Sequence, residues 1–181
     1  IDFPSEEAAT NYYLARLKNQ ILHEGSESIA AIFIEPIPGS NGVLIPPKGY
    51  LEGVRALCDE YGILMICDEV MTGFGRTGKM FAVDHFDFEP DMMTFAKGVT
   101  SGYAPLGGVI VNEKVANVID EMVLLTGLTY SGHTMCTQIG SATLDLYKEE
   151  KLIENAEEMG SVLAERLNQL VSFKSVGEVR H

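Results

Sequence analysis

The stretch from Ile63 to Lys97 constrains the fold more strongly than any other part of the sequence. It begins with an apolar run of strand length, ILMIC, which ends at two carboxylates, Asp68 and Glu69. A glycine-rich turn, GFGRTGK, comes next, and a second apolar run, MMTFA, ends at Lys97. Ligands of open α/β sheets lie outside the carboxyl ends of the strands. An acid and a lysine at two strand ends therefore predict a cofactor site at one edge of a sheet.

Apolar runs and turn residues predict an α/β fold. Residues 30–68 read strand, helix, strand, which is typical of a parallel crossover unit. The strands are continuously apolar rather than alternating, so we expect a sheet covered on both faces and doubly wound. The expected strands are 29–34, 63–67, 92–96 and 107–111, and the expected helices run between Ser5 and Gly25 and over 50–61, 113–122, 135–150 and 152–171.

Composition and charge limit the partners and the compartment. The 181 residues suffice for one domain, and a formal net charge of −13 argues against non-specific binding to nucleic acid or anionic membranes. No segment has the ~18 uninterrupted apolar residues of a membrane span. The three cysteines are odd in number and widely spaced. We therefore expect reduced thiols and a cytoplasmic location.

Asp68, Val70 and Lys97 together indicate a cofactor. Asp68 and Val70 are two positions apart at a strand end, so both side chains can point to one face. The carboxylate can pair with a protonated ring nitrogen, the valine can pack on a flat ring, and Lys97 can supply the amine of a Schiff base. Pyridoxal 5'-phosphate (PLP) needs these three groups. The pattern predicts a PLP site.

Ordinary explanations compete with this prediction. An acid at a strand end often caps a helix, and a lone lysine is usually solvated. The turn GFGRTGKM also comes close to a phosphate loop, but it ends in Met80 instead of Ser or Thr, and the acid precedes the loop. We therefore reject nucleotide binding.

The four histidines are scattered without ligand spacing, so no metal site is expected. Cys67 is expected to be a buried structural thiol. Arg76 could bind an anion or serve the loop and a subunit interface.

Four longer blocks of the sequence resemble the class III (omega-amino acid type) aminotransferases of PLP fold type I. In chain order they are IEPIPGSNGVLIPPKGYL, ICDEVMTGFGRTGKMFAVDHF, PDMMTFAKGVTSGYAPLGGVIV and TYSGH. The resemblance covers nearly the whole chain. It implies that residues 1–181 form the central to C-terminal part of a three-layer large PLP-binding domain. That domain has a mostly parallel sheet flanked by helices, and the chain would end near the boundary to a small domain.

The resemblance also implies roles for individual residues. Asp68 would bind the pyridinium nitrogen, and Val70 would pack on the ring. Lys97 would be the Schiff-base lysine and the proton shuttle. Thr129 would bind the phosphate of the cofactor in the partner subunit. Glu35 would lie near the site and, in some members, pair with a substrate-gating arginine.

The chain departs from the family pattern at several points. It lacks the preceding portion, which in the family holds a phosphate-binding turn, and it lacks the small domain with its carboxylate-reading arginine. Leu128 stands where an aromatic residue is common, and Thr134 stands where proline is usual. These two changes concern the shape of the TYSGH loop and leave the chemistry of Lys97 untouched.

The sequence thus predicts a PLP-dependent transaminase. It would move an amino group from an omega-amino acid or amine to pyruvate or another 2-oxo acid, as a homodimer or a dimer of dimers. Another reaction on the same scaffold, such as an aminomutase or a decarboxylase reaction, stays open, and so does a truncated, non-catalytic fragment. A cofactor absorbance scan separates enzyme from fragment, and product analysis separates transfer from mutase chemistry.

Overall fold

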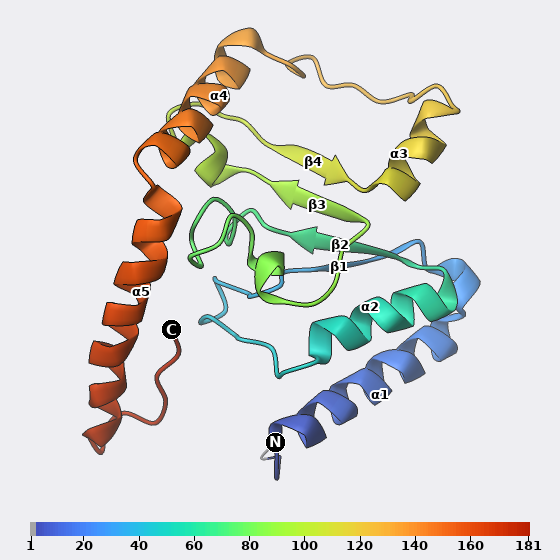
Figure 1. The fold of residues 1–181 in the computed structure, drawn as a ribbon. Coiled ribbons are helices and arrows are strands. Elements are labelled where there is room, and N and C mark those ends of the chain that lie inside the picture. Colours follow the sequence, from blue (N-terminus) through green and yellow to red (C-terminus); the bar gives the residue numbers. More distant parts are fainter. Residues whose placement is uncertain (1–2) are drawn as a thin grey trace.

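The computed structural model describes residues 3–181, which form five α-helices and one four-stranded sheet (Figure 1). Every predicted helix and strand is confirmed, and only the end residues differ. The strands are β1 (Ala31–Ile34), β2 (Leu64–Asp68), β3 (Met92–Phe95) and β4 (Gly108–Val111). The helices are α1 (Glu6–Glu24), α2 (Tyr50–Tyr61), α3 (Glu113–Asp120), α4 (Thr134–Glu149) and α5 (Leu152–Asn168).

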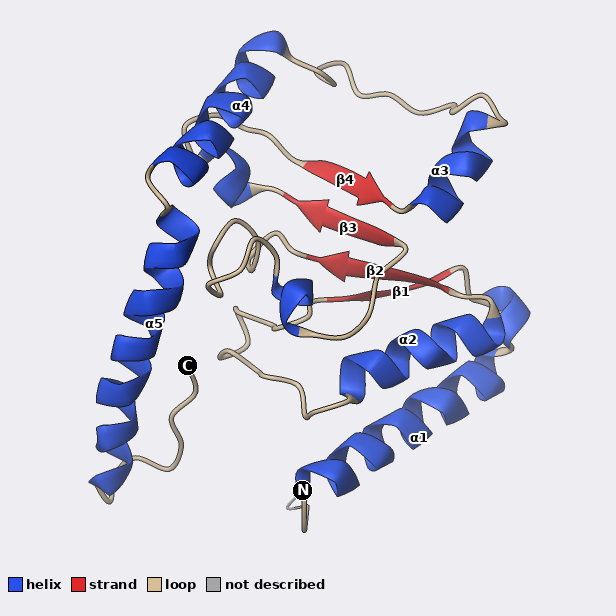
Figure 2. Ribbon diagram, in the orientation of Figure 1, coloured by secondary structure: helices blue, strands red, loops and turns tan. Residues whose placement is uncertain are grey.

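The sheet has the strand order β1-β2-β3-β4. The first three strands are parallel, and β4 runs antiparallel to β3. This confirms a mostly parallel sheet flanked by helices, with α2 as the crossover between β1 and β2. Within residues 3–181 the strand order shows no reversal, so the expected doubly wound arrangement is wrong for this part of the fold. The antiparallel step from β3 to β4 needs no crossover helix, and the short 3₁₀ helix Lys97–Thr100 and a loop connect them (Figure 2).

Helices α1 and α2 lie side by side on one face of the sheet, as Figure 1 shows. The core between these helices and the sheet is apolar. It is formed by side chains that alternate with outward-facing ones along β2 and by the inner faces of α1 and α2. Its members include Ile21, Val54, Cys58, Met65 and Cys67. The prediction that Cys67 is a buried thiol is confirmed.

The opposite face of the sheet is only partly covered. Phe33 pairs in register with Ile66, and Val109 with Thr94, so these side chains share that face. Phe33 is 58% exposed and Val109 is 57% exposed. Residues 3–181 leave this face partly open, because α4 and α5 lie along the edge beyond the carboxyl ends of β2 and β3 (Figure 2).

Asp91 holds the amino ends of β2 and β3 together. Its Oδ2 accepts the N–H of Met65 at 2.8 Å and a guanidinium N–H of Arg55 at 2.6 Å. Burial alone would raise the pKa of Asp91, but the hydrogen bonds from Met65 and Arg55 outweigh it and lower the pKa below its ordinary value. These hydrogen bonds stabilise the amino-terminal end of the sheet.

Local capping fixes where the helices begin and end. Ser5 Oγ accepts the N–H of Ala8 at 3.1 Å at the start of α1. Asn112 Oδ1 accepts the N–H of Val115 at 3.0 Å at the start of α3. Gly62 ends α2 in a left-handed conformation (φ 68°). Among residues 3–181 there is no helix with the length and apolar character required to cross a membrane.

Candidate active site

Asp68 ends β2 and Glu69 follows it, and the pleat of the sheet directs their side chains to opposite faces. Asp68 is the register partner of Thr94, on the face away from α1 and α2. It is half-buried, and its Oδ1 accepts the N–H of Val70 at 2.9 Å. Glu69 is 0% exposed. One acid thus remains available at the sheet edge while the next is enclosed.

The carboxylate of Glu69 closes the turn that follows β2. Oε2 accepts the hydroxyl of Thr72 and the N–H of Ala82 at 2.9 Å, and Oε1 accepts the N–H of Val83 at 2.8 Å. The backbone also needs Gly73 here, because a Cβ at this position would lie 2.8 Å from the carbonyl oxygen of Glu69. The turn is therefore tied at both ends to one buried side chain.

Lys97 follows the carboxyl end of β3 and begins a 3₁₀ helix, Lys97–Thr100. Its backbone is left-handed (φ 45°), a conformation that costs a non-glycine residue about 1–3 kcal/mol and is found preferentially at functional sites. The side chain is exposed, and Nζ donates to Sδ of Met71 at 2.6 Å. Tyr147 Oη donates to the carbonyl of Gly98 at 3.1 Å. A contact from α4 thus supports the backbone beside Lys97.

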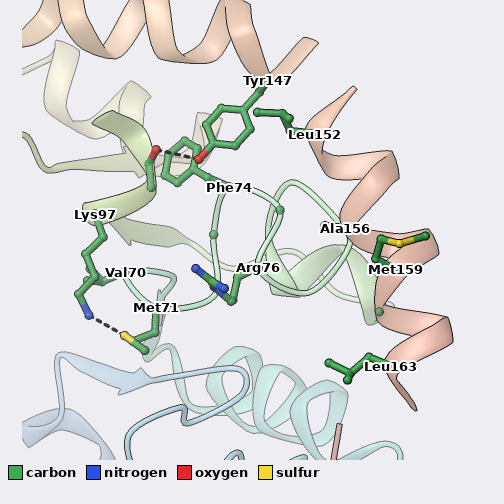
Figure 3. Close-up of a pocket in the computed structure, with 14 residues that line it drawn as sticks. Val70, Met71, Phe74, Arg76, Lys97, Tyr147, Leu152, Ala156, Met159 and Leu163 are labelled. Carbon is green, nitrogen blue, oxygen red and sulfur yellow. Dashed lines mark hydrogen bonds between the residues drawn. The ribbon is translucent and has the colours of Figure 1, made fainter. Parts of the chain in front are cut away.

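A cavity of about 740 Å³ brings several of the predicted residues together (Figure 3). Lys97, Val70 and Arg76 line it from the strand ends and the turn, and Tyr147 and Met159 line it from α4 and α5. Figure 3 shows the Lys97 and Met71 side chains meeting at one end of this cavity, with Arg76 between that contact and α5. The cavity combines two cations with apolar walls, which suits an anionic ligand that has a flat, apolar body.

Two predicted site residues lie elsewhere in the structure. Glu35 follows β1 and lines a separate cavity of about 370 Å³, and its Oε2 accepts the N–H of Gly39 at 3.4 Å. Thr129 lies in the exposed loop between α3 and α4 (Figure 1). Within residues 3–181 no hydrogen bond joins either residue to Asp68 or Lys97. Their roles stay predictions.

Sequence reasoning missed two contributors to the site. Met71 is the hydrogen-bond partner of Lys97, and nothing in the sequence pairs a thioether with an ammonium 26 positions away. Glu69 is visible in the sequence as an acid at the strand end, but its sequence context predicts no role for it. The strand pattern did carry a signal for it, because adjacent residues at a strand end point to opposite faces. With Asp68 assigned to the ligand, Glu69 had to turn toward the core.

The arrangement can be compared with known proteins. A structure of taurine:2-oxoglutarate aminotransferase from Bifidobacterium kashiwanohense, in complex with PLP and glutamate, matches 99% of this chain with 52% identity and a TM-score of 0.95, and the match covers 41% of that chain.

Two curated relatives also match most of this chain, at lower identity. Gamma aminobutyrate transaminase 2 of Solanum lycopersicum is 38% identical over 97% of this chain and 40% of its own length. The putrescine–pyruvate aminotransferase of Pseudomonas aeruginosa is 40% identical over 91% of this chain and 37% of its own length. The chain thus spans about 40% of the length of such relatives. The family model for class-III aminotransferases matches residues 2–181, and the chain belongs to that family.

Proposed function

We propose that this chain supplies the lysine-bearing part of the active site of a PLP-dependent transaminase. The observation that carries the proposal is the position of Lys97 in a class-III aminotransferase chain. Its Nζ lies beside Met71 in the cavity that Val70 also lines, at the carboxyl ends of two parallel strands. This is the sheet edge at which ligands of α/β folds bind.

The residues present fit PLP. The Lys97 amine is exposed, and a thioether, which is a weak acceptor, is its hydrogen-bond partner, so the amine can turn to an aldehyde. Asp68 uses Oδ1 to hold the Val70 N–H, and among residues 3–181 its Oδ2 has no protein donor. A carboxylate with an unused acceptor at the strand end suits a ring N–H.

Each residue then has a task. When bound, PLP supplies an aldehyde and an electron-withdrawing ring. The Asp68 carboxylate would accept the ring N–H and keep that nitrogen protonated. The Val70 side chain would pack against the ring. Lys97 Nζ would hold the cofactor and, once displaced by the donor amine, would act as the general base that takes the proton from the amine-bearing carbon of the donor.

The proposed substrates are an omega-amino acid or amine as donor and pyruvate or another 2-oxo acid as acceptor. The names of the relatives support this class. Arg76 lines the Lys97 cavity, and its planar guanidinium can bind a substrate carboxylate in a bidentate manner. Glu35 is proposed to act from the neighbouring β1 loop. That loop is close to the cavity, because a Cβ at Gly39 would lie 3.3 Å from Cε of Met71.

We also propose a cytoplasmic homodimer or dimer of dimers. The segment between α3 and α4 supports assembly, because it presents a row of large apolar side chains to solvent. Leu125 is 93% exposed and Leu128 is 81% exposed. Exposed apolar surface of this kind marks interaction sites. Three free, buried cysteines suit a reducing compartment.

Borohydride reduction of the full-length holoenzyme tests the proposal. Reduction should fix the cofactor to the Lys97 peptide, detected by mass spectrometry, and Lys97→Ala should abolish transamination. Lys79→Ala is the matched control, because Lys79 lies on the same turn and binds Glu157 at 3.0 Å outside the cavity. Labelling at Lys79, or turnover by Lys97→Ala, would refute the assignment.

A further inference from the structure

We infer that Glu69 is a positioning residue for Lys97. Through the turn that it closes, Glu69 holds Met71 against the lysine. The inference rests on the proposed function for the role of Lys97 but concerns a different residue and a different contact. It makes Glu69 part of the active-site support, although its own carboxylate is 0% exposed and cannot touch a substrate.

The first step is the reach of the Glu69 contacts. Its carboxylate joins Thr72, three positions later, to Ala82 and Val83, 13 and 14 positions later. Both oxygens are used, and the donors come from the two ends of the turn. Breaking these bonds removes the side-chain ties between the two ends of segment 70–81. The cavity residues Met71 and Arg76 lie in this segment.

The second step ties the same residue to β3. The N–H of Glu69 donates to the carbonyl of Thr94 at 2.9 Å, three positions before Lys97. The carbonyl of Glu69 accepts the N–H of Gly73 at 2.8 Å. The backbone of Glu69 therefore links the start of the turn to the strand that delivers Lys97, while its side chain closes the turn itself. The Lys97–Met71 contact of 2.6 Å spans that gap.

The third step is chemical. The donors to Glu69 are one hydroxyl and two backbone N–H groups, and a side chain with two acceptor oxygens suits them all. A glutamine of the same size must direct its NH₂ group toward one or more of these donors. Glu69→Gln therefore weakens the closure without opening a cavity.

A purely structural role predicts something else, and Asp91 provides the comparison. Asp91 is also buried and also accepts backbone and side-chain donors, but it lies at the amino ends of β2 and β3. If Glu69 served only stability, both Glu69→Gln and Asp91→Asn would lower the melting temperature, and neither would change the chemistry of Lys97. If Glu69 positions Lys97, only Glu69→Gln changes that chemistry.

The experiment compares wild-type, Glu69→Gln and Asp91→Asn forms of the full-length protein. In the PLP-free protein, the acetylation rate of Lys97 is measured by peptide mass spectrometry relative to exposed Lys148. In the holoenzyme, the PLP dissociation constant and kcat are measured, with melting temperatures for every form. We expect Glu69→Gln to raise the relative acetylation of Lys97 several-fold, and to weaken PLP binding and lower kcat by about 10-fold or more. Asp91→Asn should change only the melting temperature.

Equal acetylation of Lys97 in wild type and Glu69→Gln would overturn the inference. A wild-type protein that binds no PLP would refute the proposed function instead, and the acetylation rates would still decide the role of Glu69. Thr72→Val keeps the test open if Glu69→Gln does not fold, because it removes a single donor and retains the carboxylate. It should shift the acetylation of Lys97 in the same direction by a smaller factor.

Discussion

Asp68 and Thr94 are register partners on β2 and β3, and their side chains share the sheet face that α1 and α2 leave uncovered. The hydroxyl of Thr94 is enclosed and has no hydrogen-bond partner within residues 3–181. In the same part of the chain Asp68 forms no ion pair, and its one bond, to the N–H of Val70, is 2.9 Å long. A carboxylate without a protein cation at a strand end can serve a cationic ligand.

The Asp68→Asn variant tests whether the Asp68 carboxylate binds a cationic ring. The amide keeps the shape of the side chain but cannot hold a ring proton by charge, so PLP should still attach to Lys97 while the proton-transfer step slows. We expect a loss of about 100-fold or more in the single-turnover rate, which is ~2.7 kcal/mol in the barrier. Stopped-flow absorbance with a saturating amine donor measures it. Thr94→Val, which removes the unpaired hydroxyl next to Asp68, is the matched control and should stay near the wild-type rate.

The role of Asp91 in stability should depend on pH. Because its pKa is lowered in the folded state, Asp91 contributes stability that is present above its ordinary pKa of 3.8 and is lost as the pH falls through the lowered pKa. Asp91→Asn should lower the free energy of unfolding by about 2–3 kcal/mol at neutral pH. The difference from wild type should shrink on acidification below about pH 4. Urea unfolding across this range checks it, and a difference that stays constant would contradict the linkage.

The buried thiol of Cys67 should lower the free energy of unfolding at alkaline pH. Burial raises its pKa from 9.0 to about 12. Between these values the unfolded chain loses a proton that the folded chain retains, so the free energy of unfolding falls as the pH rises from about 9. Cys67→Ala has no thiol to titrate, so its free energy of unfolding should decline less steeply with pH. It is less stable at neutral pH because a cavity replaces the thiol. Parallel declines for both proteins would show that another group is responsible.

Much of the fold could be predicted because local signals agree with it. Ser5 caps a helix, Gly62 ends one, and apolar runs mark the strands that stop at Asp68 and Lys97. The motif blocks also identified the family. The closure of the turn by Glu69 was not predictable in the same way, because its partners lie up to 14 positions away and two of them are backbone groups with no sequence signature. The exposed face at Phe33 depends on which elements cover the sheet, and strand composition does not encode that.

The proposed assembly gives the last prediction. By family resemblance, Thr129 would serve the cofactor of the other subunit, so each active site would combine Lys97 of one chain with Thr129 of its partner. In this chain Thr129 lies in an exposed loop among exposed apolar side chains, which is where a partner could contact it. Lys97→Ala and Thr129→Ala homodimers of the full-length protein should each be inactive or weak.

Mixing the two variants then decides where Thr129 acts. If it serves the partner's site, a heterodimer holds one site with both defects and one site with neither, so activity should return to about half of wild type per heterodimer when the sites are independent. If it serves its own site, each site keeps one defect and nothing returns. Heterodimers are isolated by two different affinity tags, and Lys79→Ala mixed with Thr129→Ala is the control for tag and exchange effects. A monomer by sedimentation, or no recovery in purified heterodimers, would end the proposal, because a site shared between subunits requires both a dimer and rescue.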